Sequence, residues 1–128
     1  MKTYQRLRLW PETFAISKLS AKNEQPQWHA DKGFSSITRT EDELSIVCEQ
    51  KYVPLDVVSS RNWQMLQIVA QMDFSLVGIL ARIATPLAAA GISIFSISTY
   101  DTDYILIQKK QLELAMKVLV EEGYQIDC

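Results

Sequence analysis

The 128-residue sequence contains few of the residues that would indicate a metal centre or a disulfide-stabilised fold. It has two cysteines, Cys48 and Cys128, and a single histidine, His29. Two such cysteines do not form a disulfide framework, and a lone histidine does not form a zinc site. We therefore expect no metal and no cofactor, a reducing cytoplasmic location, and a buried, unreactive Cys48.

The sequence also lacks a large excess of charge of one sign and a long apolar run. Thirteen basic and 15 acidic side chains give a formal net charge of −2, whereas nucleic-acid binding normally requires a basic surface. The most apolar segment, residues 76–95, is interrupted by Arg82, Thr85, Pro86 and Gly91, so it is not a membrane span. The N-terminus has no continuous apolar stretch of the kind that secretory signals contain. We expect neither nucleic acid nor membrane as a partner.

Motifs for catalysis are absent too. The four glycines stand far apart, so there is no glycine-rich loop for a phosphate. His29 has no indicated serine and acid partner for nucleophilic catalysis. The apolar content of 48% is ordinary for a globular domain of this length, so the sequence predicts a folded protein without catalytic residues, and not an enzyme.

The second half of the sequence has the clearer periodicity. Alternating and helically spaced apolar residues predict the order strand, helix, strand, strand, helix, strand. The predicted strands are 63–70, 92–99, 104–108 and 124–126, and the predicted helices are 76–90 and 109–122. This βαββαβ order is the ferredoxin-like plan.

Cap residues refine the helix boundaries. Ser75 is the expected N-cap of the first helix, and Gly91 and Gly123 are expected to end the two helices. Pro86 lies inside the first helix and removes one backbone donor, so we expect a kink or a tightened last turn there.

The first half has less helix. Residues 4–9 and 13–19 are expected as two strands around a corner at Trp10–Glu12, and 34–40 and 44–48 as a hairpin. Only short helical candidates remain, one or two turns in residues 26–30 and a weak one in the segment from 54 to 60, with the join to the second half at 59–62.

An internal repeat organises the two halves. A gapless shift of 61 positions places residues 34–38 on 95–99, with matching Phe, Ser and Thr, and places Asp42 on Asp103. The repeat predicts an α+β protein of two ferredoxin-like modules side by side, residues 1–60 and 61–128, the first with reduced helices.

Three segments carry a resemblance to a known family: residues 34–48, 73–81 and 86–106. They resemble small stand-alone ACT-domain proteins related to the aspartokinase regulatory region, and are similar to the CASTOR-type arginine sensors. The resemblance is weak in residues 19–33, where a full ACT module would carry a longer helix. It implies a tandem ACT fold that binds a small molecule, usually an amino acid, without catalysis.

The resemblance also implies a ligand site between the loop after the first strand of a module and the second strand of a neighbouring module. The residues in question are Asp73, Phe74, Ser75, Leu76, Val77 and Gly78 in the loop, and Ser98, Thr99, Tyr100, Asp101, Thr102 and Asp103 at the strand end.

These residues suit an amino acid chemically. Unpaired N–H groups at a helix N-terminus favour an α-carboxylate, and Gly78 has no side chain to block the approach. Asp73, Asp101 or Asp103 would receive an ammonium group or a basic side chain. Each residue also has a local role as an alternative, because Asp and Ser are common as helix caps and in tight turns.

Two functions follow as hypotheses. The first is a cytoplasmic, non-enzymatic regulatory sensor whose ligand is an amino acid and whose binding is read as a population shift. The alternative is a ligand-free protein-interaction or dimerisation module, which the reduced helices of the first half favour slightly. In either case a homodimer is expected, because an open sheet edge is a pairing surface. The sequence leaves the ligand, the protein partner and the number of sites open.

Overall fold

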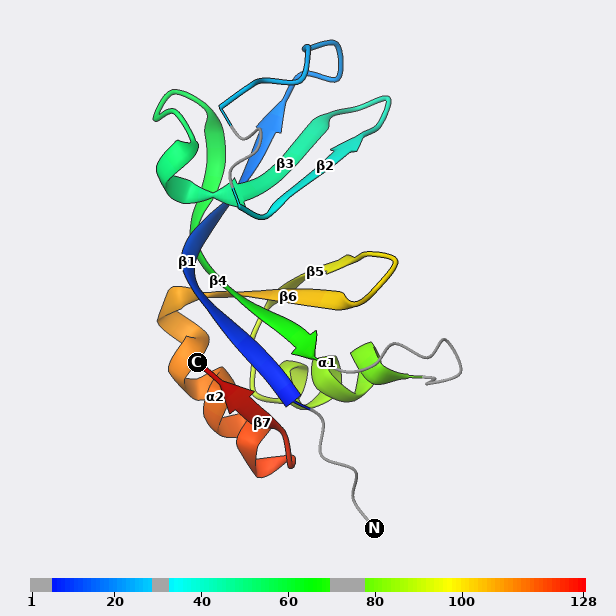
Figure 1. Cartoon of the computed structure of the whole chain (residues 1–128), viewed down its shortest axis with the longest axis vertical. Coiled ribbons are helices and arrows are strands. Elements are labelled where there is room, and N and C mark those ends of the chain that lie inside the picture. The colour runs from blue at the N-terminus through cyan, green and yellow to red at the C-terminus, as the bar shows by residue number, and fades with distance from the viewer. Residues whose placement is uncertain (1–5, 29–32, 70–77) are drawn as a thin grey trace. The chain divides into compact units, whose positions relative to one another are not determined.

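The computed structural model describes residues 6–28, 33–69 and 78–128 (Figure 1). In chain order the elements are β1 (Arg6–Leu19), β2 (Ser35–Arg39), β3 (Leu44–Glu49), the 3-10 turn η1 (Gln50–Tyr52), β4 (Val58–Val69), α1 (Ile79–Ala89), β5 (Ile94–Ser98), β6 (Asp103–Gln108), the 3-10 turn η2 (Lys109–Gln111), α2 (Leu112–Glu121) and β7 (Gln125–Asp127).

The chain forms two compact units. The first contains the residues up to Pro11 together with Gln64–Cys128, and the second contains Glu12–Trp63. Strands hydrogen-bond in the order β2-β3-β1-β4-β6-β5, and β7 pairs with β1. The long strands β1 and β4 each contribute to both units. The sequence-based division after residue 60 does not include this sharing, because it assigns the whole of β1 to the first half.

The first unit has the α+β order predicted for the second half of the sequence. Its helices and strands share one hydrophobic core, in which alternate strand residues face the apolar sides of α1 and α2. The buried members are Leu7, Leu66, Ile68, Ile79, Ile83, Leu87, Ile92, Ile105, Ile107, Ala115 and Leu119. The predicted apolar side of the first helix is confirmed at Ile79, Ile83 and Leu87.

Strand β7 pairs in parallel with the start of β1. A ferredoxin-like module made of residues 61–128 alone would not contain this pairing, because β1 lies outside those residues. Arg6 is opposite Gln125, and Arg8 is opposite Asp127. The Arg6 side chain donates from Nε and Nη2 to Oδ2 of Asp127, at 3.0 and 2.7 Å. In Figure 1 the chain runs from α2 into β7, which lies along β1.

The expected corner at Trp10–Glu12 is wrong, because β1 is one strand from Arg6 to Leu19. Strand β1 pairs with β7 through Arg6–Arg8 and with β3 through Phe14–Leu19. Pro11, which has no backbone N–H, lies between these two ladders and interrupts neither. The proline therefore marks a change of partner along the strand and not a turn.

The first helix begins later than predicted. Its N-cap is Gly78, with φ of +79°, and the helix starts at Ile79. The predicted cap Ser75 falls in residues 70–77, which the structure does not describe.

Both helices end as the glycines predict. Gly91 has φ of +75°, its N–H bonds the Ala88 carbonyl, and the Ile92 N–H bonds the Leu87 carbonyl, which is a Schellman motif. The Ala90 N–H is shared between the carbonyls of Pro86 and Leu87, at 3.1 Å each. The Glu122 N–H is shared in the same way between the carbonyls of Val118 and Leu119 in α2, which has no proline, so this sharing is not specific to Pro86 and the effect expected of Pro86 stays a prediction. Gly123, at φ of +99°, ends α2 with the same pattern.

The second unit contains no α-helix among its described residues, 12–28 and 33–63. The helical candidate in the segment from 54 to 60 is wrong. The Val57 N–H bonds the Pro54 carbonyl in a turn, and β4 begins at Val58 because β-branched residues favour the strand. Residues 26–28 are not helical either, and Trp28 packs on the core. That core consists of Ala15, Leu44, Ile46, Cys48 and Val53.

The two hairpins are related by 59 positions and not by the 61 of the sequence comparison. The first strand of each hairpin ends at Arg39 and at Ser98. The second strand begins at Leu44 and at Asp103. The 3-10 turn that follows each hairpin begins at Gln50 and at Lys109. A strand repeats every two residues, so a two-residue slip keeps every side chain on its face. The alternation of apolar and polar residues is therefore the same for shifts of 59 and 61 positions, and it does not distinguish them.

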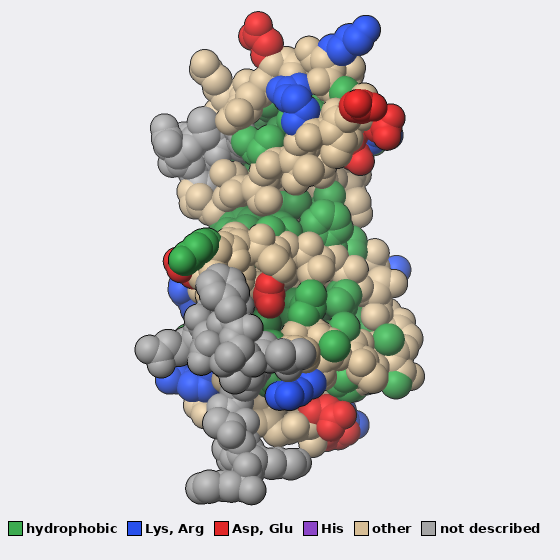
Figure 2. Space-filling view, turned by 90° about the vertical axis from the view of Figure 1, so that its right-hand side faces the viewer, with side chains coloured by type: hydrophobic (Ala, Val, Ile, Leu, Met, Phe, Trp, Pro, Cys, Tyr) green, Lys and Arg blue, Asp and Glu red, His purple; other side chains and the backbone are tan. Residues whose placement is uncertain are grey.

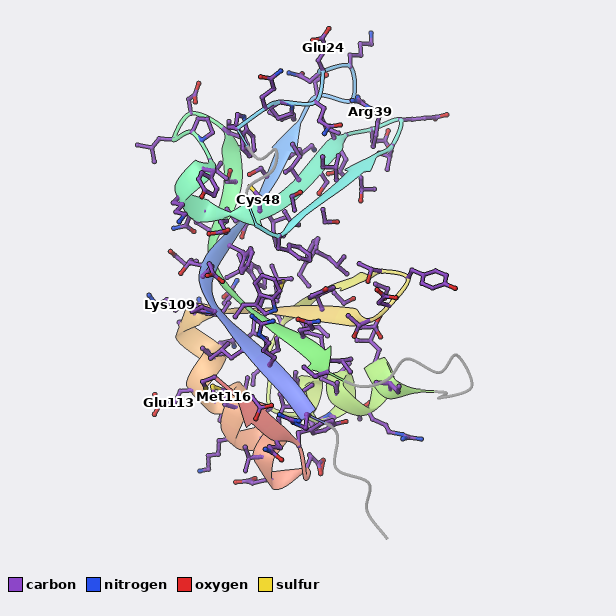
Figure 3. All side chains as sticks on the ribbon, in the orientation of Figure 1. Glu24, Arg39, Cys48, Lys109, Glu113 and Met116 are labelled. Atoms are coloured by element: carbon purple, nitrogen blue, oxygen red, sulfur yellow. The ribbon has the colours of Figure 1, made fainter. Side chains whose placement is uncertain are left out.

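Cys48 is the small buried residue that the sequence predicted. It lies on β3, labelled in Figure 3, with none of its surface exposed. Burial, with a smaller contribution from the neighbouring Glu49 carboxylate, raises the pKa of its thiol from 9.0 to about 11.

We predict that Gly91→Ala lowers the free energy of unfolding by about 1 to 2 kcal/mol, because an alanine is strained at this positive φ. Urea denaturation measures the change. Gly91→Asn is the matched control, and its free energy of unfolding should fall by less, since asparagine tolerates the left-handed conformation. Equal losses in the two variants would contradict the backbone explanation.

We also predict a loss of stability at alkaline pH that depends on Cys48. The folded-state pKa lies above the ordinary value of 9.0, so the stabilisation is complete below pH 9 and is lost as the pH rises through about 11. The Cys48→Val variant cannot ionise at this position. Between pH 9 and about 11 its free energy of unfolding should fall by roughly 2 to 3 kcal/mol less than that of the unchanged protein. Urea denaturation of both proteins at several pH values tests this, and identical pH profiles would refute it.

Candidate functional site

Thr99 organises the turn between β5 and β6. The Thr99 N–H bonds the Thr102 carbonyl at 2.8 Å, and the Thr99 hydroxyl donates to the same carbonyl at 3.1 Å. The Thr102 N–H in turn reaches the Thr99 hydroxyl at 3.3 Å. Thr40 makes the corresponding bonds in the hairpin of the second unit, so a threonine at the first turn position closes both hairpins.

Thr102 connects this turn to the end of β4. Only 5% of its surface is exposed, and its hydroxyl donates to the Ile68 carbonyl at 2.6 Å. Ile68 is the penultimate residue of β4, and the segment predicted to form the ligand loop, residues 73–78, begins five positions later. The structure therefore places the β5–β6 turn beside the end of β4.

The polar side chains of the turn differ in what they contact. The Ser98 hydroxyl donates to the Asp103 carboxylate, so one oxygen of Asp103 serves the turn itself. Asp101 is exposed, and the described residues give its carboxylate neither a hydrogen bond nor an ion pair. Tyr100 is 82% exposed. Asp101 is thus the carboxylate of this turn that remains accessible to a ligand.

Gly78 lies at the start of α1. A Cβ placed on Gly78 would meet no atom within 4 Å, so its positive φ, and not a close contact, calls for glycine. The Arg82 N–H bonds the Gly78 carbonyl at 2.9 Å and closes the first helical turn. The N–H groups at the start of α1 precede this bond and have no acceptor within the helix.

The predicted ligand residues are therefore described only in part. Ser98 to Asp103 share the β5–β6 turn, and Gly78 caps α1. Asp73, Phe74, Ser75, Leu76 and Val77 fall in the gap of the described chain between 69 and 78. Sequence reasoning missed the buried hydroxyl contact of Thr102, for which a threonine in a turn gives no specific signal.

A cavity of about 470 Å³ lies elsewhere in the first unit. Its lining is Ala81, Arg82, Thr85, Pro86, Glu122 and Tyr124, which includes none of the predicted ligand residues. Burial raises the pKa of the Tyr124 phenol above its usual 10.0; the Arg82 cation opposes this rise and Glu122 adds to it.

Among the residues that the structure describes, no group of three or more His, Cys, Asp or Glu side chains could hold a metal ion. No helix in the described ranges is long and apolar enough to cross a membrane. On the face shown in Figure 2, acidic and basic side chains are interspersed and do not form a broad field of one charge.

We predict that Thr102→Val, which removes the donor to the Ile68 carbonyl but keeps the shape of the side chain, lowers the free energy of unfolding by about 1 to 2 kcal/mol. Thr38→Val, at an exposed position on β2, is the control and should change stability by less than about 0.5 kcal/mol. Thermal unfolding of the two variants measures the difference. An unchanged Thr102→Val protein would show that this bond does not hold the turn.

Comparisons with known proteins relate this fold to a family. A model of the ACT domain matches residues 58–121, and a model of an N-terminal domain matches residues 12–56. The human cytosolic arginine sensor for mTORC1 subunit 1 is 36% identical over 94 residues, which cover 67% of this chain but 29% of that protein. The chain thus spans less than a third of this relative.

Solved structures give the same relation. A crystal structure of a protein from Agrobacterium tumefaciens has a TM-score of 0.92 and 34% identity, covering 98% of this chain and 93% of its own. The regulatory subunit of aspartate kinase from Thermus thermophilus has a TM-score of 0.63 at 12% identity, covering 90% and 95%, and so shares the fold. The chain belongs to the ACT domain family.

Proposed function

We propose that this protein is a non-enzymatic regulatory protein that binds an amino acid at the β5–β6 turn. The observation that carries the proposal is the hydrogen bond from Thr102 to the Ile68 carbonyl, at 2.6 Å. It brings the turn to the end of β4, the strand after which the sequence predicts the other side of the site. The loop residues Asp73 to Val77 belong to the proposal.

The ends of an amino acid find complementary groups in this site. The free N–H groups and positive partial charge at the start of α1 suit the α-carboxylate. Gly78 adds no side chain there. Asp101 is the group that receives a cation, since its carboxylate is accessible and has no partner among the described residues.

A basic amino acid is the ligand class that we favour. Asp101 and Asp103 place two carboxylates on one turn, and Asp73 would add a third. A relative that matches 67% of this chain is named an arginine sensor. We therefore propose arginine or lysine as the first ligands to test, and a cytosolic location for the protein, as that relative's name states for itself.

The regulatory unit proposed here is a pair of ACT-like modules in a homodimer. The matching hairpins and 3-10 turns of the two units support descent of residues 1–60 and 61–128 from one module, the first with reduced helices. Strands β2 and β5 are the ends of the strand order, and β5 carries Ile94, Phe95 and Ile97 half-buried along its length. An edge strand of this kind pairs readily with a second copy. Ligand binding would then shift the population of paired states.

We expect arginine or lysine to raise the unfolding temperature of the purified protein in a screen of all twenty amino acids at millimolar concentration. A ligand at about 100 times its dissociation constant adds about 2.7 kcal/mol, which corresponds to several degrees. The Asp101→Asn variant should bind about tenfold more weakly because it loses a charged hydrogen bond.

The chain offers a matched control for this variant. Asp42 occupies the position of Asp101 in the other hairpin and is likewise exposed, so Asp42→Asn should bind as the unchanged protein does. Twenty flat unfolding curves would reject the sensor and favour a ligand-free interaction module. Sedimentation of the same samples tests the homodimer, which a monomer at micromolar concentration would contradict.

A further inference from the structure

The second unit contains a cavity of about 560 Å³ that the sequence analysis did not anticipate. This volume is in the range of about 300–1,000 Å³ that small-molecule sites occupy. It lies where β3 ends and η1 begins, and includes the start of β4. The lining residues are Glu12, Thr13, Glu49, Gln50, Lys51, Val53, Leu55 and Arg61.

Glu49 supplies a nearly buried negative charge to this cavity. Only 8% of its surface is exposed. Its carboxylate lies 3.7 Å from the Lys51 ammonium group, and the described residues give it no hydrogen bond. A buried carboxylate without hydrogen bonds is costly, so this position favours a ligand that donates to it.

Arg61 supplies a fixed positive charge. Its Nη2 donates to the carbonyls of Val53 and Pro54, at 3.3 and 3.2 Å. These bonds hold the guanidinium in place, and the Nε and Nη1 donors have no acceptor among the described residues. A guanidinium held in this way is prepared to bind a carboxylate with two hydrogen bonds.

The rest of the lining combines a second cation with apolar surface. Lys51 is exposed and lies over the Tyr52 ring, 5.2 Å from its centroid. Leu55 is 91% exposed, and Val53, which also lines the cavity, is buried. The cavity therefore presents two acids, Glu12 and Glu49, two bases and an apolar wall.

We propose that this cavity is a second binding site, for a small zwitterion that carries an ammonium group and a carboxylate. The Glu49 carboxylate receives the ammonium group and the Arg61 guanidinium binds the carboxylate. Leu55 covers the apolar part of the ligand. An anion alone would give Glu49 no hydrogen-bond donor, so its carboxylate would keep only the Lys51 ion pair, and a cation alone would leave the Nε and Nη1 donors of Arg61 unused.

The site is distinct from the proposed site at the β5–β6 turn. All of its lining residues belong to the second unit, Glu12–Trp63. The hairpin correspondence of 59 positions aligns Glu49 with the neutral Gln108 at the end of β6. The first unit thus lacks the counterpart of the Glu49 carboxylate, and the site is not a copy of a feature that both units share.

The test is an NMR titration of the full ¹⁵N-labelled chain with each of the twenty amino acids, and with acetate and methylamine, at millimolar concentrations. At least one amino acid should shift the amide signals of Glu49–Val53 and Arg61 saturably. Acetate and methylamine should each bind at least about tenfold more weakly, because each fills half of the site.

Two conservative variants assign the binding. Glu49→Gln keeps the shape of the side chain, and Arg61→Lys keeps the charge but not the planar fork; each should weaken binding about tenfold. Arg39→Lys, in the same unit but outside the cavity, is the control and should leave it unchanged. The spectra of the free variants show whether each one folds, and Glu49→Gln decides the result if Arg61→Lys does not fold.

The outcomes separate the two proposed sites. Shifts confined to Thr99–Asp103 would support the site at the β5–β6 turn and overturn the second site. Shifts confined to Glu49–Arg61 would support the second site and count against amino-acid binding at the turn. Saturable shifts that persist unchanged in both Glu49→Gln and Arg61→Lys would also overturn the proposal, as would no saturable shift.

Discussion

The pairing of strand β1 first with β7 and then with β3 is the constraint on which the rest of the structure depends. Its first residues form a parallel ladder with β7, and its last six form an antiparallel ladder with β3. The last strand of the chain is therefore held by the first, and the two hydrogen bonds from Arg6 to Oδ2 of Asp127 reinforce that ladder. Because β1 belongs to both units, the first unit, which is otherwise made of residues from Gln64 onward, requires residues from the start of the sequence.

The hairpins of the two units have the same turn structure. In both units a threonine at the first turn position closes the turn, and an aspartate two residues later remains exposed. Thr102 differs from its counterpart Glu43, because its buried hydroxyl binds the end of β4. The two units thus share one hairpin geometry and differ in the surroundings of the hairpins. The first unit binds its turn to the end of β4, and the second has a charged cavity at the opposite end of its hairpin.

The sequence predicted the second half well because helix and strand periods there are strong and glycines mark the helix ends. Gly91 and Gly123 end the two helices as predicted, and their positive φ explains why they are glycines. The predictions were wrong where a residue or pattern is compatible with two structures. Pro11 suggested a corner but lies between two ladders, and the two-residue slip of the hairpin repeat left the alternation intact. Of the candidate site, the sequence predicted the turn residues but not the contact of Thr102.

By itself the sequence determined the family, the α+β order of the second half, and the buried, unreactive character of Cys48. These properties depend on local periodicity, short motifs and composition. The tertiary structure alone decided that β1 joins β7, that Thr102 reaches Ile68, and that Glu49 and Arg61 line one cavity. Each of these pairs brings together residues that are 12 to 121 positions apart, and local patterns carry no information about such contacts.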